Sequence, residues 1–139
     1  IPQNTAAIIR TCACLGAKLE IIEQCGFLLS DKRFKRVVMD YMDYSQIEFY
    51  QSSEKFFEAK KKQRIVLMTT KGSINYTKFK FKPDDTILFG RESAGVPEKV
   101  HKIIKNRLKI PMNNQVRSLN IASSVAIVLA ESLRQIELI

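Results

Sequence analysis

The chain has 139 residues, of which 45% are hydrophobic and 27% charged. This balance is typical of one soluble globular domain and excludes a disordered or collagen-like chain. The longest uncharged run, residues 118–130, is shorter than the roughly 18–20 apolar residues that a membrane-spanning helix needs. No basic segment followed by an apolar run opens the chain, so we expect a cytoplasmic protein without a secretion signal.

The net charge of +9 is concentrated in one part of the chain. Fifteen Lys and Arg but only five Asp and Glu lie between Lys55 and Lys109, whereas acidic residues slightly outnumber basic ones elsewhere. A local excess of this size is typical of a protein that binds a polyanion such as RNA, DNA or a phosphate-rich ligand. The alternative is a solvated, lysine-rich surface.

The apolar spacing predicts alternating helices and strands in the first part of the chain. In order, these are a helix at 4–15, a strand at 19–22, a short helix within 31–44, a strand at 46–50 and a helix at 52–62. The first helix has Asn4 or Thr5 as its cap and Gly16 as its stop, and the last begins with a serine cap.

The same alternation continues to the end of the chain. In order, we expect a strand at 64–70, a turn at 71–72, a strand at 86–90, a helix from Pro97 to about Asn106, a strand at 107–111 and a helix at 118–136 capped by Ser118. This order predicts an α/β fold with a mainly parallel sheet flanked by helices. Because such a fold usually opens with a strand, we also expect that a strand precedes Ile1.

The helix that begins at Pro97 has two kinds of face. We expect its aliphatic residues to face the core and its lysines to face solvent; these are Val100, Ile103 and Ile104, and Lys99, Lys102 and Lys105, respectively. The single histidine, His101, is expected on the polar, RNA-facing side.

The cysteines do not suggest disulfides or a metal site. Cys12 and Cys14 are two residues apart on a predicted helix and therefore point to different faces. A zinc site would need them to converge with Cys25 and His101 from distant parts of the chain. We expect reduced, mostly buried thiols and no bound metal.

Common nucleotide-binding and hydrolase motifs are absent. The chain has no GxxxxGK[ST], GxGxxG or GxSxG motif. Three polar segments stand out instead: PQNTAAIIR at 2–10, FGRESAGVPE at 89–98 and IPMNNQVRSLN at 110–120. The last two follow predicted strands, where parallel sheets bind ligands. The alternative is that they are ordinary turns between strands and helices.

These segments resemble, in the same order, the signature motifs of the SPOUT-class RNA 2′-O-ribose methyltransferases. The shared patterns are Pro-x-Asn-Thr…Ile-x-Arg, Phe-Gly-x-Glu-x-x-Gly-Val-Pro and Ile-Pro-Met…Arg-Ser-Leu-Asn. The short length, together with IIEQCGF at 21–27, DKRFKR at 31–36 and TTKG at 69–72, resembles the single-domain branch that methylates the wobble nucleotide of tRNA.

The resemblance implies one SPOUT-type methyltransferase domain over residues 1–139, with a deep trefoil knot in its C-terminal part, and a homodimer. It also implies S-adenosylmethionine as the methyl donor, held mainly by main-chain atoms. The positions that match the family's cofactor contacts are Met68, Gly90, Ile110, Ser118 and Leu119.

The implied reaction methylates the ribose 2′-hydroxyl of the wobble nucleotide in the tRNA anticodon stem-loop. Family accounts give the role of base to the arginine that matches Arg10. Because an arginine side chain stays protonated at neutral pH, we expect Arg10 instead to bind the neighbouring phosphate or to stabilise the developing negative charge. Candidates to orient the ribose, or alternatively to stabilise their own loops, are Asn4, Glu92 and Asn120. Candidates to bind RNA are Arg10, Lys71, Lys99, Lys102 and Lys105.

The chain departs from the family pattern at two places. Ala6 and Ala7 replace a Gly-Asn pair, and Ala130 stands where many relatives have a tyrosine linked to tRNA binding. Two alternatives therefore stay open: methylation of ribosomal RNA or of another tRNA site, and a basic RNA-binding module without catalysis. Neither a membrane nor a metal ion is expected among the partners.

Overall fold

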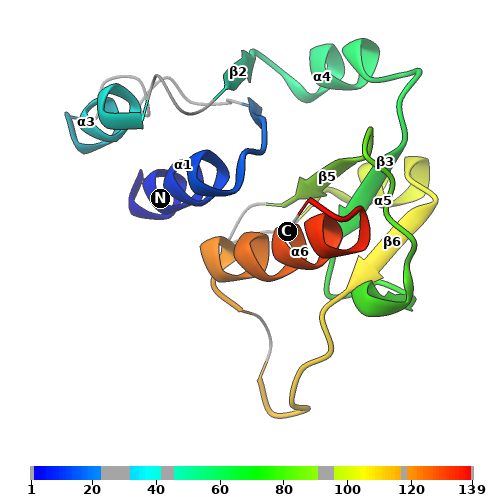
Figure 1. Ribbon diagram of the computed structural model, residues 1–139. Helices are drawn as coiled ribbons and strands as arrows, with labels where there is room; N and C mark the ends of the chain where they lie inside the picture. Colours follow the sequence, from blue (N-terminus) through cyan, green and yellow to red (C-terminus); the bar gives the residue numbers. More distant parts are fainter. Residues whose placement is uncertain (1, 23–31, 42–45, 91–95, 117–118, 139) are drawn as a thin grey trace. The chain divides into compact units, whose positions relative to one another are not determined.

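A computed structural model describes residues 2–22, 32–41, 46–90, 96–116 and 119–138 (Figure 1). The chain divides into two compact units, Ile1–Lys61 and Lys62–Ile139. The single domain expected from the sequence stays a prediction. Within the described residues, no helix is long and apolar enough to cross a membrane.

The first unit alternates helices with two parallel strands. Its elements are α1 (Pro2–Leu15), β1 (Leu19–Ile22), α3 (Lys32–Tyr41), β2 (Ile47–Tyr50) and α4 (Ser53–Ala59). In the sheet, Leu19 pairs with Ile47. The elements predicted in this part of the chain are confirmed. The predicted first cap is wrong, because α1 already begins at Pro2 and Asn4 lies within its first turn. A proline is well tolerated at the start of a helix, where no N–H is needed.

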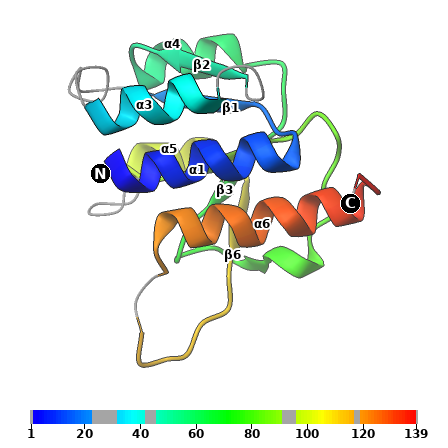
Figure 2. The ribbon, with the colours of Figure 1, turned by 60° about the vertical axis from the view of Figure 1, so that its left-hand side comes forward.

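The core of the first unit forms around Ile9, which is fully buried against side chains of both strands and of α3. Helices α1 and α3 lie side by side (Figure 2). Gly16 ends α1 with a φ of 74°, in the left-handed region that glycine adopts without strain. Ser52 caps α4 as predicted, since its hydroxyl accepts a hydrogen bond from the Lys55 N–H at 3.2 Å.

The expectation of mostly buried thiols is confirmed for one of the two cysteines that the structure describes. Cys12 is buried and Cys14 is exposed, and both are free thiols. Burial raises the pKa of the Cys12 thiol to about 11, because the thiolate is poorly solvated there. Cys25 lies outside the described residues.

The second unit is built on a parallel sheet with the strand order β4-β6-β3-β5. Its elements are β3 (Ile65–Met68), β4 (Ile74–Asn75), the 3₁₀ helix η1 (Tyr76–Lys78), β5 (Thr86–Phe89), α5 (Glu98–Ile103), β6 (Asn106–Lys109) and α6 (Ile121–Gln135). The predicted α/β fold with a parallel sheet flanked by helices is therefore confirmed. Two elements, β4 and η1, have two and three residues and were too short to show a sequence period.

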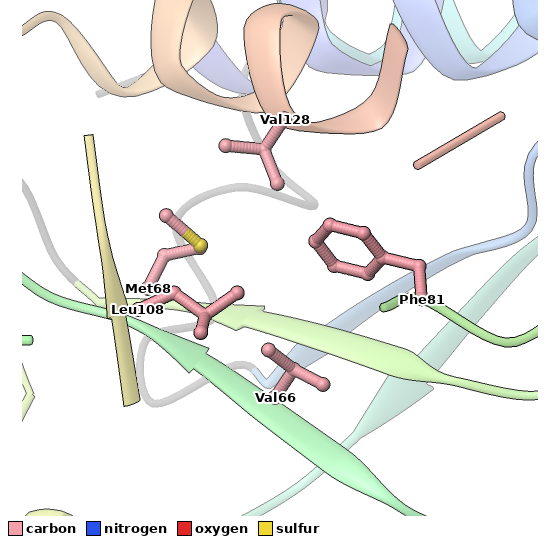
Figure 3. Packing of buried hydrophobic residues seen from close by; sticks show 5 residues of the cluster. All are labelled: Val66, Met68, Phe81, Leu108 and Val128. Carbon is pink, nitrogen blue, oxygen red and sulfur yellow. The ribbon is translucent and has the colours of Figure 1, made fainter. Parts of the chain in front are cut away.

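One face of this sheet carries the hydrophobic core of the second unit. Val66 and Met68 of β3 and Leu108 of β6 point from the strands toward Val128 of α6, and Phe81 closes the side (Figure 3). Val66, Leu108 and Val128 are fully buried. Helix α6 therefore covers this face, and packing explains the apolar residues on its buried side.

Helix α5 differs from its prediction in two respects. Its buried residues are Val100 and His101, and Ile104, which directly follows the helix in an extended conformation, is buried as well. The predicted exposure of His101 is wrong, because only 7% of the residue is accessible. The predicted burial of Ile103 is also wrong, because this residue is 63% exposed. Since Ile103 lies four residues after Lys99, it shares the solvent-facing side of the helix.

Candidate functional site

The carboxyl ends of three adjacent strands lie level with one another. Met68, the last residue of β3, pairs with Phe89 of β5 on one side and with Leu108 of β6 on the other. Gly90 follows Phe89 directly, and Ile110 comes two residues after Leu108. Three of the five positions expected to hold the cofactor therefore share one sheet edge. Parallel sheets bind their ligands at this edge.

Apolar side chains pack beside the strand ends at this edge. Phe89 and Ile110 are partly buried and pack against the core cluster that contains Met68. A flat, mostly apolar ring system can lie on such a surface. Its polar atoms can bind main-chain groups at the strand ends, which no longer have a strand partner beyond them.

The loop between β3 and β4 is held against the end of β6. The Thr69 N–H donates to the Leu108 carbonyl at 2.9 Å, and the Gly72 N–H donates to the Thr69 carbonyl at 3.0 Å. A Cβ atom at Gly72 would overlap the carbonyl group of Leu108. Only glycine allows this close approach, so the turn predicted at 71–72 has a specific cause.

A partly buried hydrogen-bonded pair that the sequence analysis missed lies next to this loop. The Thr69 Oγ1 and the His101 Nε2 are 2.8 Å apart, although the two residues are separated by 32 positions in the chain. The available signal was the place of His101 beside Val100 on an otherwise lysine-rich helix.

The residue that caps the N-terminus of α6 differs from the predicted one. The Asn120 Oδ1 accepts hydrogen bonds from the N–H groups of Ala122 and Ser123, at 2.9 and 3.2 Å, so Asn120 and not Ser118 caps the helix. Asn120 is thus engaged in stabilising its own loop, the alternative given above for this residue. Leu119 precedes it and is 40% exposed. Ser118 lies outside the described residues.

Two candidates for catalysis belong to the first unit, and the structure does not describe the third. Arg10 is exposed, with its guanidinium carbon 5.4 Å from the centroid of the Tyr41 ring, a cation–π distance. Asn4 is half-buried within α1. Glu92 lies outside the described residues. The catalytic roles of these residues stay predictions.

The lysines expected to bind RNA are all on the surface. Lys71, Lys99, Lys102 and Lys105 are exposed. The Lys71 Nζ lies 3.8 Å from the Glu98 Oε2, a contact that links the β3–β4 loop to α5. In the part of the chain that the structure describes, no group of three His, Cys, Asp or Glu side chains could hold a metal ion.

A parallel α/β sheet with level strand ends and apolar side chains beside them is typical of proteins that bind a ligand at that edge of the sheet. Residues 1–130 match the SpoU rRNA Methylase family, and the chain belongs to this family. The chain is 47% identical to the tRNA (cytidine(34)-2′-O)-methyltransferase of Beijerinckia indica, over 98% of this chain and 86% of that protein.

Solved structures agree with this membership. A structure described as "Structural insights into the 2-OH methylation of C/U34 on tRNA" has a TM-score of 0.91 and 38% identity, and the match covers 99% of this chain and 90% of that one. An AdoMet-bound rRNA methyltransferase from Sinorhizobium meliloti has a TM-score of 0.83 and 25% identity, covering 96% and 52% of the two chains.

Proposed function

We propose that this protein transfers a methyl group from S-adenosylmethionine to the ribose 2′-hydroxyl of the wobble nucleotide in the tRNA anticodon loop. The observation that carries the proposal is the 47% identity, over nearly the whole chain, to a tRNA (cytidine(34)-2′-O)-methyltransferase. Ribosomal RNA, the substrate named for a relative at 25% identity, is the second candidate.

The strand ends of the second unit suit this cofactor. In this proposal the adenine ring lies against the apolar side chains beside Met68, and main-chain groups of Gly90 and Ile110 bind its polar edge; the packing of Phe89 and Ile110 on the Met68 cluster supports this. Leu119 and Ser118 would contribute from the segment before α6. When bound, the cofactor supplies a methyl group on a positively charged sulfur. The protein then has to hold this methyl in line with the ribose oxygen.

Arg10 acts in this proposal as a fixed cation. Its guanidinium binds the phosphate next to the target ribose or stabilises the negative charge that develops on the 2′-oxygen. The proton leaves to that phosphate or to water. Asn4 and Glu92 orient the ribose, whereas Asn120 holds the loop before α6 through its helix cap.

The proposal includes the assembly and topology expected for the family: one domain, a C-terminal trefoil knot and a cytoplasmic homodimer built on α1 and α6. Leu119, just before α6, is 40% exposed, and Ile127, within α6, is 37% exposed. These partly exposed aliphatic side chains support a role for α6 and the segment before it in the two-fold interface. Sedimentation at micromolar concentration should give a dimer, and a monomer would contradict this part of the proposal.

The function is tested by methyl incorporation from radiolabelled S-adenosylmethionine into total RNA, followed by mapping of the labelled nucleotide. We expect label on the wobble ribose of tRNA. A synthetic anticodon stem-loop with 2′-deoxyribose at the wobble position is the matched control and should accept no methyl group. Label in ribosomal RNA, or at another tRNA nucleotide, would reject the proposed substrate. Failure to bind the cofactor in calorimetry would favour the non-catalytic RNA-binding module.

A further inference from the structure

We infer that His101 is a positioning residue: through Thr69 it fixes the β3–β4 loop at the cofactor edge of the sheet. The histidine itself touches neither substrate nor cofactor in this scheme. The identity of the ligand at this edge rests on the proposed function. The position of the loop does not depend on that identity.

The hydrogen bonds around His101 follow from the tautomer that its neighbours favour. Its Nδ1 lies 3.5 Å from the Pro97 carbonyl, which can only accept, so we place the ring proton on Nδ1. The Nε2 is then an acceptor and receives the Thr69 hydroxyl proton at 2.8 Å. The Thr69 Oγ1 in turn accepts the Lys71 N–H at 3.2 Å. A continuous chain of donors and acceptors therefore runs from the loop into α5.

Thr69 contacts β6 through its main chain and α5 through its side chain. Its neighbour Met68 points into the core below α6, and because side chains alternate along a strand, the Thr69 side chain lies on the opposite face, toward α5. Its N–H also donates to the Leu108 carbonyl, which joins it to β6. Rotation of Thr69 would disturb the main chain next to Met68, a proposed cofactor position.

Burial of His101 makes its contact with Thr69 stronger than the exposed ion pair between α5 and this loop. His101 is 7% exposed and Thr69 is partly buried, so water compensates only in part for the loss of this hydrogen bond. The other contact, Lys71 to Glu98, is 3.8 Å long, with both side chains about 70% exposed. Exposed ion pairs of this kind contribute little.

The variants that test the inference remove one end of the contact at a time. His101→Leu removes the acceptor, and Thr69→Val removes the hydroxyl while keeping the shape and the N–H that binds Leu108. We expect each to weaken S-adenosylmethionine binding about tenfold in calorimetry, the loss typical of one unsatisfied buried group. The KM for the cofactor should rise similarly, with little change in kcat or in the KM for tRNA.

Three further variants separate positioning from a general loss of stability. The double variant should bind the cofactor no more weakly than the worse single variant, because both remove the same contact. His101→Gln, whose side-chain oxygen reaches near the Nε2 position, should recover most of the affinity. Thr86→Val is the matched control: it removes a hydroxyl at the opposite end of the same sheet, beside Gln63, and should leave binding unchanged.

A second measurement needs no cofactor. In the ligand-free protein, the Lys71 amide should exchange its hydrogen about tenfold faster in His101→Leu than in the wild type or in Thr86→Val. The inference would be overturned if both variants had a lower Tm but kept the wild-type rate of Lys71 amide exchange and the wild-type affinity for the cofactor. If the wild-type protein itself fails to bind S-adenosylmethionine, the proposed function fails, and the exchange result alone decides the positioning role.

Discussion

Arg64 holds Asp85 in a two-point ion pair, with Nε 2.6 Å from Oδ1 and Nη2 2.7 Å from Oδ2. The two residues precede β3 and β5, so the pair joins these strands at the edge opposite the candidate site. Asp85 also accepts the Lys82 N–H at 2.8 Å, and its side chain is almost fully buried. The hydrogen bonds that Arg64 donates to Asp85 raise the pKa of Arg64 above its usual value.

Replacing Asp85 should therefore destabilise the fold without affecting the site. Asp85→Asn removes the charge that Arg64 faces, and we expect the free energy of unfolding to fall by about 2 kcal/mol, as for hydrogen bonds to charged groups. The exposed neighbour gives the control: Asp84→Asn should change it by less than about 0.5 kcal/mol. Urea denaturation measures both. Equal stabilities of the two variants would show that the pair contributes nothing.

Gly72 should tolerate no larger residue. A Cβ atom there overlaps the Leu108 carbonyl, so Gly72→Ala must displace the β3–β4 loop from β6. We expect a loss of about 1–3 kcal/mol of stability, typical of overpacking, and weaker binding of S-adenosylmethionine. Ser73→Ala, at the exposed next position, should keep both properties. Thermal unfolding and calorimetry test this, and a fully stable, tightly binding Gly72→Ala would contradict the close packing.

The lysines in and just after α5 should govern the salt dependence of tRNA binding. If Lys99, Lys102 and Lys105 bind phosphates, replacing all three by Gln should flatten the plot of log affinity against log salt, because fewer counterions are released. Cofactor affinity should stay the same. The control replaces Lys32, Lys35 and Arg36 of α3 by Gln, an equal change of charge outside the basic stretch, and should keep the slope. An unchanged slope for the α5 variant would mean a merely solvated surface.

Variants of Arg10 distinguish two roles for this residue when the 2′-hydroxyl loses its proton. If it is a fixed cation, Arg10→Lys should keep part of the single-turnover rate, whereas Arg10→Ala should lose about 10²-fold. Cofactor affinity should change little, since the proposed cofactor positions lie in the second unit. The rate is measured against pH for all three proteins. A pH break in the wild type that disappears in Arg10→Ala would instead identify the arginine as the base.

The two described cysteines should differ in reactivity. Alkylating reagents attack the thiolate, and the raised pKa of Cys12 keeps it protonated until the pH approaches about 11. At neutral pH, Cys14 should therefore be modified much faster than the buried Cys12, as mass spectrometry of digested peptides would show. Comparable rates in the folded protein would contradict the burial of Cys12. Denaturant should abolish the difference, which provides the control.

The sequence predicted the helices and strands that are long enough to show a regular spacing of apolar residues. The apolar runs at 19–22, 64–70 and 86–90 became β1, β3 and β5, and the alternation with helices gave the parallel α/β class. The family resemblance of the ordered motifs implied Met68, Gly90 and Ile110 as cofactor positions; the structure shows that they lie at the ends of adjacent strands, and their role stays a prediction. These features depend on local pattern and on chain order, which the sequence states directly.

Only the tertiary structure decided the details that depend on distant partners. It brought Met68 level with Phe89 and Leu108, because strand register is set by hydrogen bonds between segments far apart in the chain. It buried His101, since an imidazole can face water or the interior and Thr69 supplied the partner that made burial favourable. It also placed the start of α6 at Asn120, whose side chain reached the free N–H groups of the first turn.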